Sequence, residues 1–185
     1  IPETTITSAP SGSISSTSAT IEFSSNETGV TYQVWLDSGD WIAATSPLSL
    51  TDLSQGAHSI LVCAIDAAGN LDTSPAYANW TVDTAAPDTT ITSAPSGDVS
   101  STSATISFTS NESGVTFQRK LDSGSWTTAT SPLSLTSLTQ GAHTIKIRAI
   151  DAAGNTDATP ASATWTVDTS APNTTITAAP SGNVS

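Results

Sequence analysis

The sequence predicts an all-β chain of tandem β-sandwiches, about seven strands each, arranged as an extended rod. The chain repeats itself with a period of 85 residues, and residues 3–85 match residues 88–170 at 59 of 83 positions without a gap. Short alternating runs rich in Thr, Val, Ile and aromatic residues are separated by Pro, Gly and Asn, and no stretch has a helical period. A fixed internal period of this kind indicates a repeat architecture.

The repeat divides the chain into three parts. Two copies, 1–85 and 86–170, are each long enough to bury a modest core. We expect residues 171–185 to form the first strand of a third copy, because residues 173–185 match residues 88–100 at 10 of 13 positions. Both linkers contain Pro, so neighbouring domains should be held in a nearly fixed, extended line.

Alternation between apolar and polar residues places the strands of the first copy and their inward faces. Strands are predicted at 4–7, 18–25, 31–37, 47–51, 59–65 and 76–83. The predicted core of the first copy is Ala19, Ile21, Phe23, Tyr32, Val34, Leu36, Leu48, Leu50, Ile60, Val62, Ala64, Ala78, Trp80 and Val82. The same set recurs in the second copy as Ile106, Phe108, Phe117, Leu121, Ile145, Ile147, Trp165 and Val167.

The composition excludes several classes of partner. Ser and Thr make up 64 of 185 residues, Lys and Arg only 4, and the net charge is -12. Nucleic acid and anionic lipid need clustered cations, so we expect neither as a partner, whereas divalent cations fit. We also expect no direct membrane insertion, because no apolar run has the length of a membrane span. With Cys63 as the single thiol, an internal disulfide is impossible.

Several short motifs occur in both copies and together cover almost the whole chain. In the first copy they are Pro10-Ser11-Gly12, Leu36-Asp37-Ser38-Gly39, Thr45-Ser46-Pro47, Gly56-Ala57-His58, Asp66-Ala67-Ala68-Gly69-Asn70 and Trp80-Thr81-Val82-Asp83-Thr84. In these motifs the chain resembles the bacterial immunoglobulin-like repeats, with fibronectin-III-like sandwich topology, of long secreted and surface-anchored proteins. The resemblance implies an extracellular or cell-surface stalk, spacer or adhesive module, and it implies no reaction.

Oxygen-bearing side chains are predicted to meet at one end of the second copy. The hairpin turn that contains Asp151 and Asn155 should lie beside Glu112 and beside the linker that brings Asp83 and Asp88. Hard oxygen ligands of this kind are what Ca²⁺ requires, so we expect a calcium site at the repeat junction. The alternative is that each Asp only caps its turn.

Two histidines, His58 and His143, occupy matching positions just before a strand, with Ser and Asp nearby. The sequence contains neither a nucleophile elbow nor a Gly-rich oxyanion loop. We therefore expect no enzymatic activity, and we expect the histidines to close the preceding turns by hydrogen bonding.

Five Asn residues open an Asn-x-Ser/Thr sequon. They are Asn26, Asn79, Asn111, Asn173 and Asn183. With so many hydroxyl residues such matches arise by chance, so glycosylation depends on whether the source has the machinery.

Differences between the copies predict interfaces. Trp35, Leu61, Cys63 and Tyr77 become Lys120, Lys146, Arg148 and Ser162 in the second copy, at positions that should point outward from one sheet. An apolar outer patch on a soluble protein usually marks an interface, here with another chain or repeat; the alternative is that Trp35 only covers its neighbours. The third-copy segment should also pair with another chain or the rest of its domain, through Ile176 and Val184.

Three functions follow from these patterns. The first is a structural segment of an extracellular surface protein, acting as a stalk, spacer or adhesive fibre. The second is a subunit of a self-assembling extracellular filament. The third is an adhesin module that binds surface glycans or proteins, for which Trp41 and Trp126 are candidates if they are exposed.

Overall fold

A computed structural model describes residues 1–179 of the chain. The chain divides into two compact units. One contains Ile1–Asp88 together with Ser110–Thr116 and Arg148–Thr159, which are loop-bearing segments of the second copy. The other contains Thr89–Thr109, Phe117–Ile147 and the described part of Pro160–Ser185.

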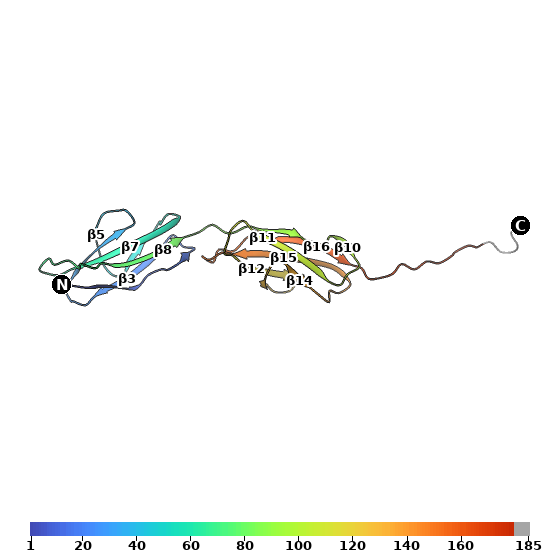
Figure 1. The fold of residues 1–185 in the computed structure, drawn as a ribbon, viewed down its shortest axis with the longest axis horizontal. Helices are drawn as coiled ribbons and strands as arrows, with labels where there is room; N and C mark the ends of the chain where they lie inside the picture. Colours follow the sequence, from blue (N-terminus) through green and yellow to red (C-terminus); the bar gives the residue numbers. More distant parts are fainter. Residues whose placement is uncertain (180–185) are drawn as a thin grey trace. The chain divides into compact units, whose positions relative to one another are not determined.

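The first copy is a sandwich of two sheets (Figure 1). One sheet has the order β1-β3-β6 and the other the order β2-β8-β7-β4-β5. All pairings are antiparallel except β2 with β8, which is parallel. The strands are β1 (Thr4–Ser8), β2 (Ser13–Ile14), β3 (Ala19–Ser25), β4 (Thr31–Leu36), β5 (Ile42–Ala44), β6 (Leu48–Leu50), β7 (Gly56–Ile65) and β8 (Ala76–Val82).

The second copy repeats this topology strand for strand. Its sheets have the orders β14-β11-β9 and β10-β16-β15-β12-β13. The strands are β9 (Thr89–Ser93), β10 (Gly97–Val99), β11 (Ala104–Ser110), β12 (Thr116–Leu121), β13 (Thr127–Ala129), β14 (Leu133–Leu135), β15 (Gly141–Ile150) and β16 (Ala161–Val167). The predicted all-β sandwich class is therefore confirmed.

Each copy has eight strands, whereas about seven were predicted and six were placed by residue range. In the first copy, sequence patterns placed neither β2 nor β5. Strand β2 has two residues and pairs with β8, which lies far along the chain, so local alternation cannot reveal it. Strand β5 is a three-residue edge strand whose Ile42 is exposed, and a short run with no buried face has no period to detect.

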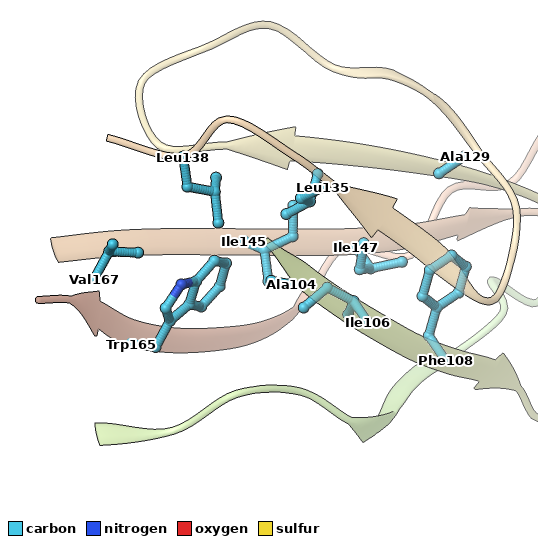
Figure 2. Close-up of a cluster of buried hydrophobic side chains, with 10 residues drawn as sticks. All are labelled: Ala104, Ile106, Phe108, Ala129, Leu135, Leu138, Ile145, Ile147, Trp165 and Val167. Atoms are coloured by element: carbon cyan, nitrogen blue, oxygen red, sulfur yellow. The ribbon is translucent and has the colours of Figure 1, made fainter. Parts of the chain in front are cut away.

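The cores confirm the predicted inward faces. In the first copy Ile21, Ile60 and Val62 are fully buried between the sheets, and Phe23 meets Tyr32 edge-to-face with ring centroids 4.9 Å apart. Figure 2 shows the matching cluster of the second copy, where Ile106, Phe108, Ile145, Ile147 and Trp165 fill the space between the strands. Sequence patterns did not predict Leu53 and Leu138 as core residues. Both side chains are buried, and they lie in the segments that precede β7 and β15.

The third-copy segment is described only as far as residue 179. Residues 171–179 contain no strand and are exposed, with Ile176 at 80 % exposure. Val184 and Asn183 lie outside the described residues. The pairing of this segment with another chain or domain stays a prediction. Within residues 1–179 there is no helix of the length and apolarity needed to cross a bilayer.

Candidate cation site at the first linker

The linker after β8 is held by hydrogen bonds between the Gln55 side chain and residues Asp83 and Thr84, here called the linker clasp. Gln55 donates from Nε2 to Asp83 Oδ1 at 2.7 Å, and Gln55 Oε1 accepts the Thr84 amide at 3.0 Å. Asp83 Oδ1 also accepts the Ala85 amide at 3.1 Å. One carboxylate oxygen of Asp83 is thereby engaged. Among residues 1–179 no hydrogen bond reaches the other oxygen, Oδ2, which is the atom available to a cation.

The turn after β15 is organised around Asp151. Its Oδ1 accepts the Asn155 amide at 2.8 Å, and its Oδ2 accepts Asn155 Nδ2 at 2.7 Å. Burial acts to raise the pKa of Asp151, but the hydrogen bonds from the Asn155 side chain and backbone outweigh it and lower the pKa below its usual value. Asp151 is therefore a carboxylate anion at neutral pH.

Three carboxylates meet at this linker. One oxygen atom each of Asp83, Glu112 and Asp151 lies within 4.8 Å of the others, and all three residues are half-buried. Like charges this close repel one another, so a cation bound among them would relieve the repulsion. Carboxylate oxygens are the ligands that Ca²⁺ takes, with waters completing its six to eight positions.

The other two predicted ligands have different surroundings. Asp88 is exposed and stands outside the group of three, and its backbone exchanges two hydrogen bonds with Asn111 at 2.7 Å and 3.1 Å. Asn155 donates its Nδ2 both to Asp151 and to the backbone oxygen of Asp83, the latter at 2.7 Å. In this geometry Asn155 braces the turn against the linker, and its amide nitrogen is not a metal ligand.

The two histidines close turns, as predicted. His58 Nε2 lies 2.8 Å from the Ser54 carbonyl, at the other end of the turn, and the ring stacks on Trp80 at 5.9 Å. His143 Nε2 makes the same contact with the Thr139 carbonyl at 2.8 Å. Both histidines are buried.

The predicted outer patch of the first copy needs one correction. Trp35, Leu61 and Tyr77 do form a row across β4, β7 and β8, because Leu61 is the register partner of both others. Tyr77 is 59 % exposed and the other two are half-buried. Cys63, however, is buried at 5 % exposure, since its sulfur packs on the Asp72 backbone oxygen at 3.5 Å, in the segment between β7 and β8. The outer patch is hereafter Trp35, Leu61 and Tyr77.

The sequon residues within the described chain are all exposed. Asn26 and Asn111 lie in equivalent loops, and each accepts a backbone amide through Oδ1, from Glu3 at 2.8 Å and from Asp88 at 2.7 Å. Asn79 lies on β8, where its Nδ2 donates to the Tyr77 hydroxyl at 3.2 Å. Asn173 lies beyond β16. Glycosylation at these positions stays a prediction.

Comparison with solved structures identifies the class of fold. No family model and no curated protein matches the chain. The fibronectin(III)-like modules of CbhA from Clostridium thermocellum are similar over 89 % of this chain and 94 % of theirs, with a TM-score of 0.55 and 17 % identity. A Ca²⁺-stabilized adhesin of an Antarctic bacterium that binds ice aligns with 89 % of this chain and 48 % of its own, with a TM-score of 0.44 and 19 % identity. The likeness to the CbhA modules shows that the chain has the immunoglobulin-like, fibronectin-III-like fold.

Proposed function

We propose that the chain is a non-enzymatic spacer segment of an extracellular surface protein, stiffened at its linker by Ca²⁺. Such a segment would hold another module away from a surface. The fold supports this proposal, because the CbhA structure with which the chain shares its fold consists of fibronectin(III)-like modules.

The observation that carries the proposal is the linker clasp, because both copies build its parts. Gln140 repeats the contacts of Gln55, with Nε2 on Asp168 Oδ1 at 2.8 Å and Oε1 on the Thr169 amide at 3.0 Å. The incoming chain is held in the same way in each copy, by Asn26 at Glu3 and by Asn111 at Asp88. Hydrogen bonds on both sides of a short linker restrict its backbone, which is what a spacer requires and a flexible tether does not.

Calcium would add to this restriction. The group of three carboxylates joins the linker residue Asp83 to Glu112 and Asp151, which lie in two separate loops. A cation shared by the three would cross-link segments far apart in sequence and would remove their mutual repulsion. Binding to the folded state alone would stabilise it by mass action.

The experiment compares the chain in Ca²⁺ and in chelator. Ca²⁺ is expected to raise the melting temperature. It is also expected to change the distance distribution derived from X-ray scattering, by increasing the maximum distance or by narrowing the distribution. Asp151→Asn should abolish both effects. The matched control is Asp66→Asn, which alters the equivalent turn of the first copy, where Asp66 accepts Asn70 in the same way but is not a member of the group of three.

Two results would count against the proposal in different ways. Identical melting temperatures and scattering in Ca²⁺ and in chelator would contradict the calcium site but would leave the spacer function standing. A broad interdomain distance distribution in both conditions, measured between spin labels on the two copies, would remove the spacer itself.

A further inference from the structure

The first copy has a hollow on the outer face of its larger sheet. Its volume is about 300 Å³, and it is lined by Gln33, Trp41, Cys63, Leu71, Asp72 and Pro75. Trp41 and Leu71 are 42 % and 53 % exposed, whereas Cys63 and Asp72 are buried. The opening is therefore apolar and accessible, and the buried Asp72 is among the residues that line the hollow. A volume at the lower end of the range of ligand pockets suits one side chain better than a larger ligand.

In sequence, the second copy has the same residues at four of the six lining positions. Offsetting the chain by 85 residues places Gln118, Trp126, Asp157 and Pro160 on their identical counterparts. Only two lining positions differ: Leu71 becomes Thr156, and Cys63 becomes Arg148. Arg148 is half-buried on β15, and Trp126 is half-buried where Trp41 is exposed. The second copy thus supplies its own arginine at the position where the first copy has a short thiol.

The hollow of the first copy retains the chemistry that suits a guanidinium group. Asp72 is only 4 % exposed, and its carboxylate accepts hydrogen bonds from two residues, Thr4 and Ser74. The donors are the Thr4 amide on Oδ2 at 2.8 Å, and the Ser74 amide and hydroxyl on Oδ1 at 2.8 Å and 3.2 Å, with the neutral Cys63 sulfur on the backbone oxygen nearby. None of these donors carries a charge.

The net negative charge of the first copy also favours the binding of a cationic group. Residues 1–85 contain nine Asp and Glu and no Lys or Arg. Hydrogen bonds from neutral donors lower the pKa of Asp72 against the effect of its burial, which keeps the carboxylate ionised at neutral pH. An ionised buried carboxylate without a positive neighbour is a costly arrangement that an incoming cation would improve.

We infer that this hollow binds the arginine side chain of a partner protein, which takes the place that Arg148 holds in the second copy. The guanidinium plane would stack along Trp41, and its N–H groups would reach Asp72 Oδ2 and the Gln33 side chain. Arginine fits better than lysine, because its flat, weakly hydrated head both stacks on an aromatic ring and donates hydrogen bonds in its plane. This inference is independent of the calcium site, since the two share no residue.

The test uses the whole chain and short blocked tripeptides, Gly-X-Gly, in which X is Arg, Lys, citrulline or Leu. Binding is followed by the indole N–H resonance of Trp41 and by calorimetry. The Arg peptide is expected to bind in the millimolar range. The Lys and citrulline peptides should bind at least about threefold more weakly, and the Leu peptide more weakly still.

Two variants locate the site. Cys63→Arg places an arginine at the position that corresponds to Arg148 of the second copy, beside the hollow, and should weaken binding of the Arg peptide by at least about tenfold. Trp41→Ala removes one wall without touching the buried core, and should have a similar effect. The control is Trp126→Ala, the same change in the copy that carries Arg148, which should leave peptide binding unchanged.

Several results would overturn the inference. A Leu peptide that binds as tightly as the Arg peptide would show a plain apolar hollow. A citrulline peptide of equal affinity would show that charge plays no part. Unchanged Arg-peptide binding in folded Trp41→Ala would place the site elsewhere, and this variant decides the matter even if Cys63→Arg fails to fold.

Discussion

His58 lies with its Nδ1 atom 2.8 Å from Asp37 Oδ2, while its Nε2 atom lies 2.8 Å from the carbonyl oxygen of Ser54. Neither a carboxylate nor a carbonyl can donate, so both ring nitrogens must carry a proton for both contacts to be hydrogen bonds. The second copy has the same arrangement, with His143 Nδ1 2.9 Å from Asp122 Oδ2. In its imidazolium form each buried histidine donates to both acceptors, and it then links the turn before β7 or β15 to the turn after β4 or β12.

The first prediction concerns pH. The Ser54 carbonyl raises the pKa of His58, burial lowers it, and Asp37 raises it further. The pKa of His143 is likewise raised by the Thr139 carbonyl and by Asp122. A raised folded-state pKa means that the contribution to stability is complete below about pH 6.5, the ordinary histidine value, and is lost as pH rises through the folded-state value. We expect the melting temperature to fall between pH 6 and pH 9.

Single variants separate the two copies. His58→Gln should remove the part of this pH dependence that belongs to the first copy and leave that of the second. Calorimetric melting across the pH range provides the measurement. A flat profile above pH 6 in the unaltered chain would mean that the histidines are neutral.

The second prediction compares the loss of stability when a core residue, Ile60, and its outward-facing neighbour, Leu61, are each truncated to Ala. Ile60 is fully buried, so Ile60→Ala should lower the free energy of unfolding of the first copy by about 2–5 kcal/mol. Leu61 points to the opposite face and is half-buried, so Leu61→Ala should cost roughly half as much or less. Urea unfolding measures both. Equal losses would show that the outer face of β7 is as well packed as the core.

The third prediction concerns the outer patch of Trp35, Leu61 and Tyr77. Replacing Trp35 and Leu61 by Lys should weaken any assembly of the native protein without unfolding the domain. The fold should tolerate the change, because the second copy carries Lys120 and Lys146 at these positions in the same sheet. Sedimentation velocity measures assembly, and melting provides the control. Unaltered assembly together with wild-type melting would show that the patch is not an interface.

The fourth prediction concerns the segment around Ile176. In the native protein we expect this exposed segment to be paired as a strand with another chain or with the rest of a third domain, so that its amides are protected. Amide hydrogen exchange measures this directly. Rapid exchange throughout residues 173–179 in the native assembly would contradict the prediction, and the equivalent strand β9 provides a protected reference.

The candidate calcium site was only partly predictable. The motif spacing predicted that a hairpin turn and a linker meet at one end of a sandwich, and the three carboxylates lie in these segments and in the loop of Glu112. Which side chains converge depends on distances that span the chain: Glu112 and Asp151 join Asp83, whereas Asp88 remains exposed and Asn155 acts as a donor. The hollow beside Cys63 was missed for a similar reason. The sequence shows that Cys63 of the first copy corresponds to Arg148 of the second. It does not show that the segment after β7 buries Cys63.

The sequence by itself determined the repeat, the all-β class and the inward faces of most strands, because these depend on local alternation and on identity at a fixed offset. Only the tertiary structure decided the parallel pairing of β2 with β8, the burial of Cys63 and the contacts of both histidine nitrogens. Each of these depends on which distant segment covers a residue or supplies its hydrogen-bond partner. Such partners are set by the folding of the whole sandwich, and no local pattern in the chain records them.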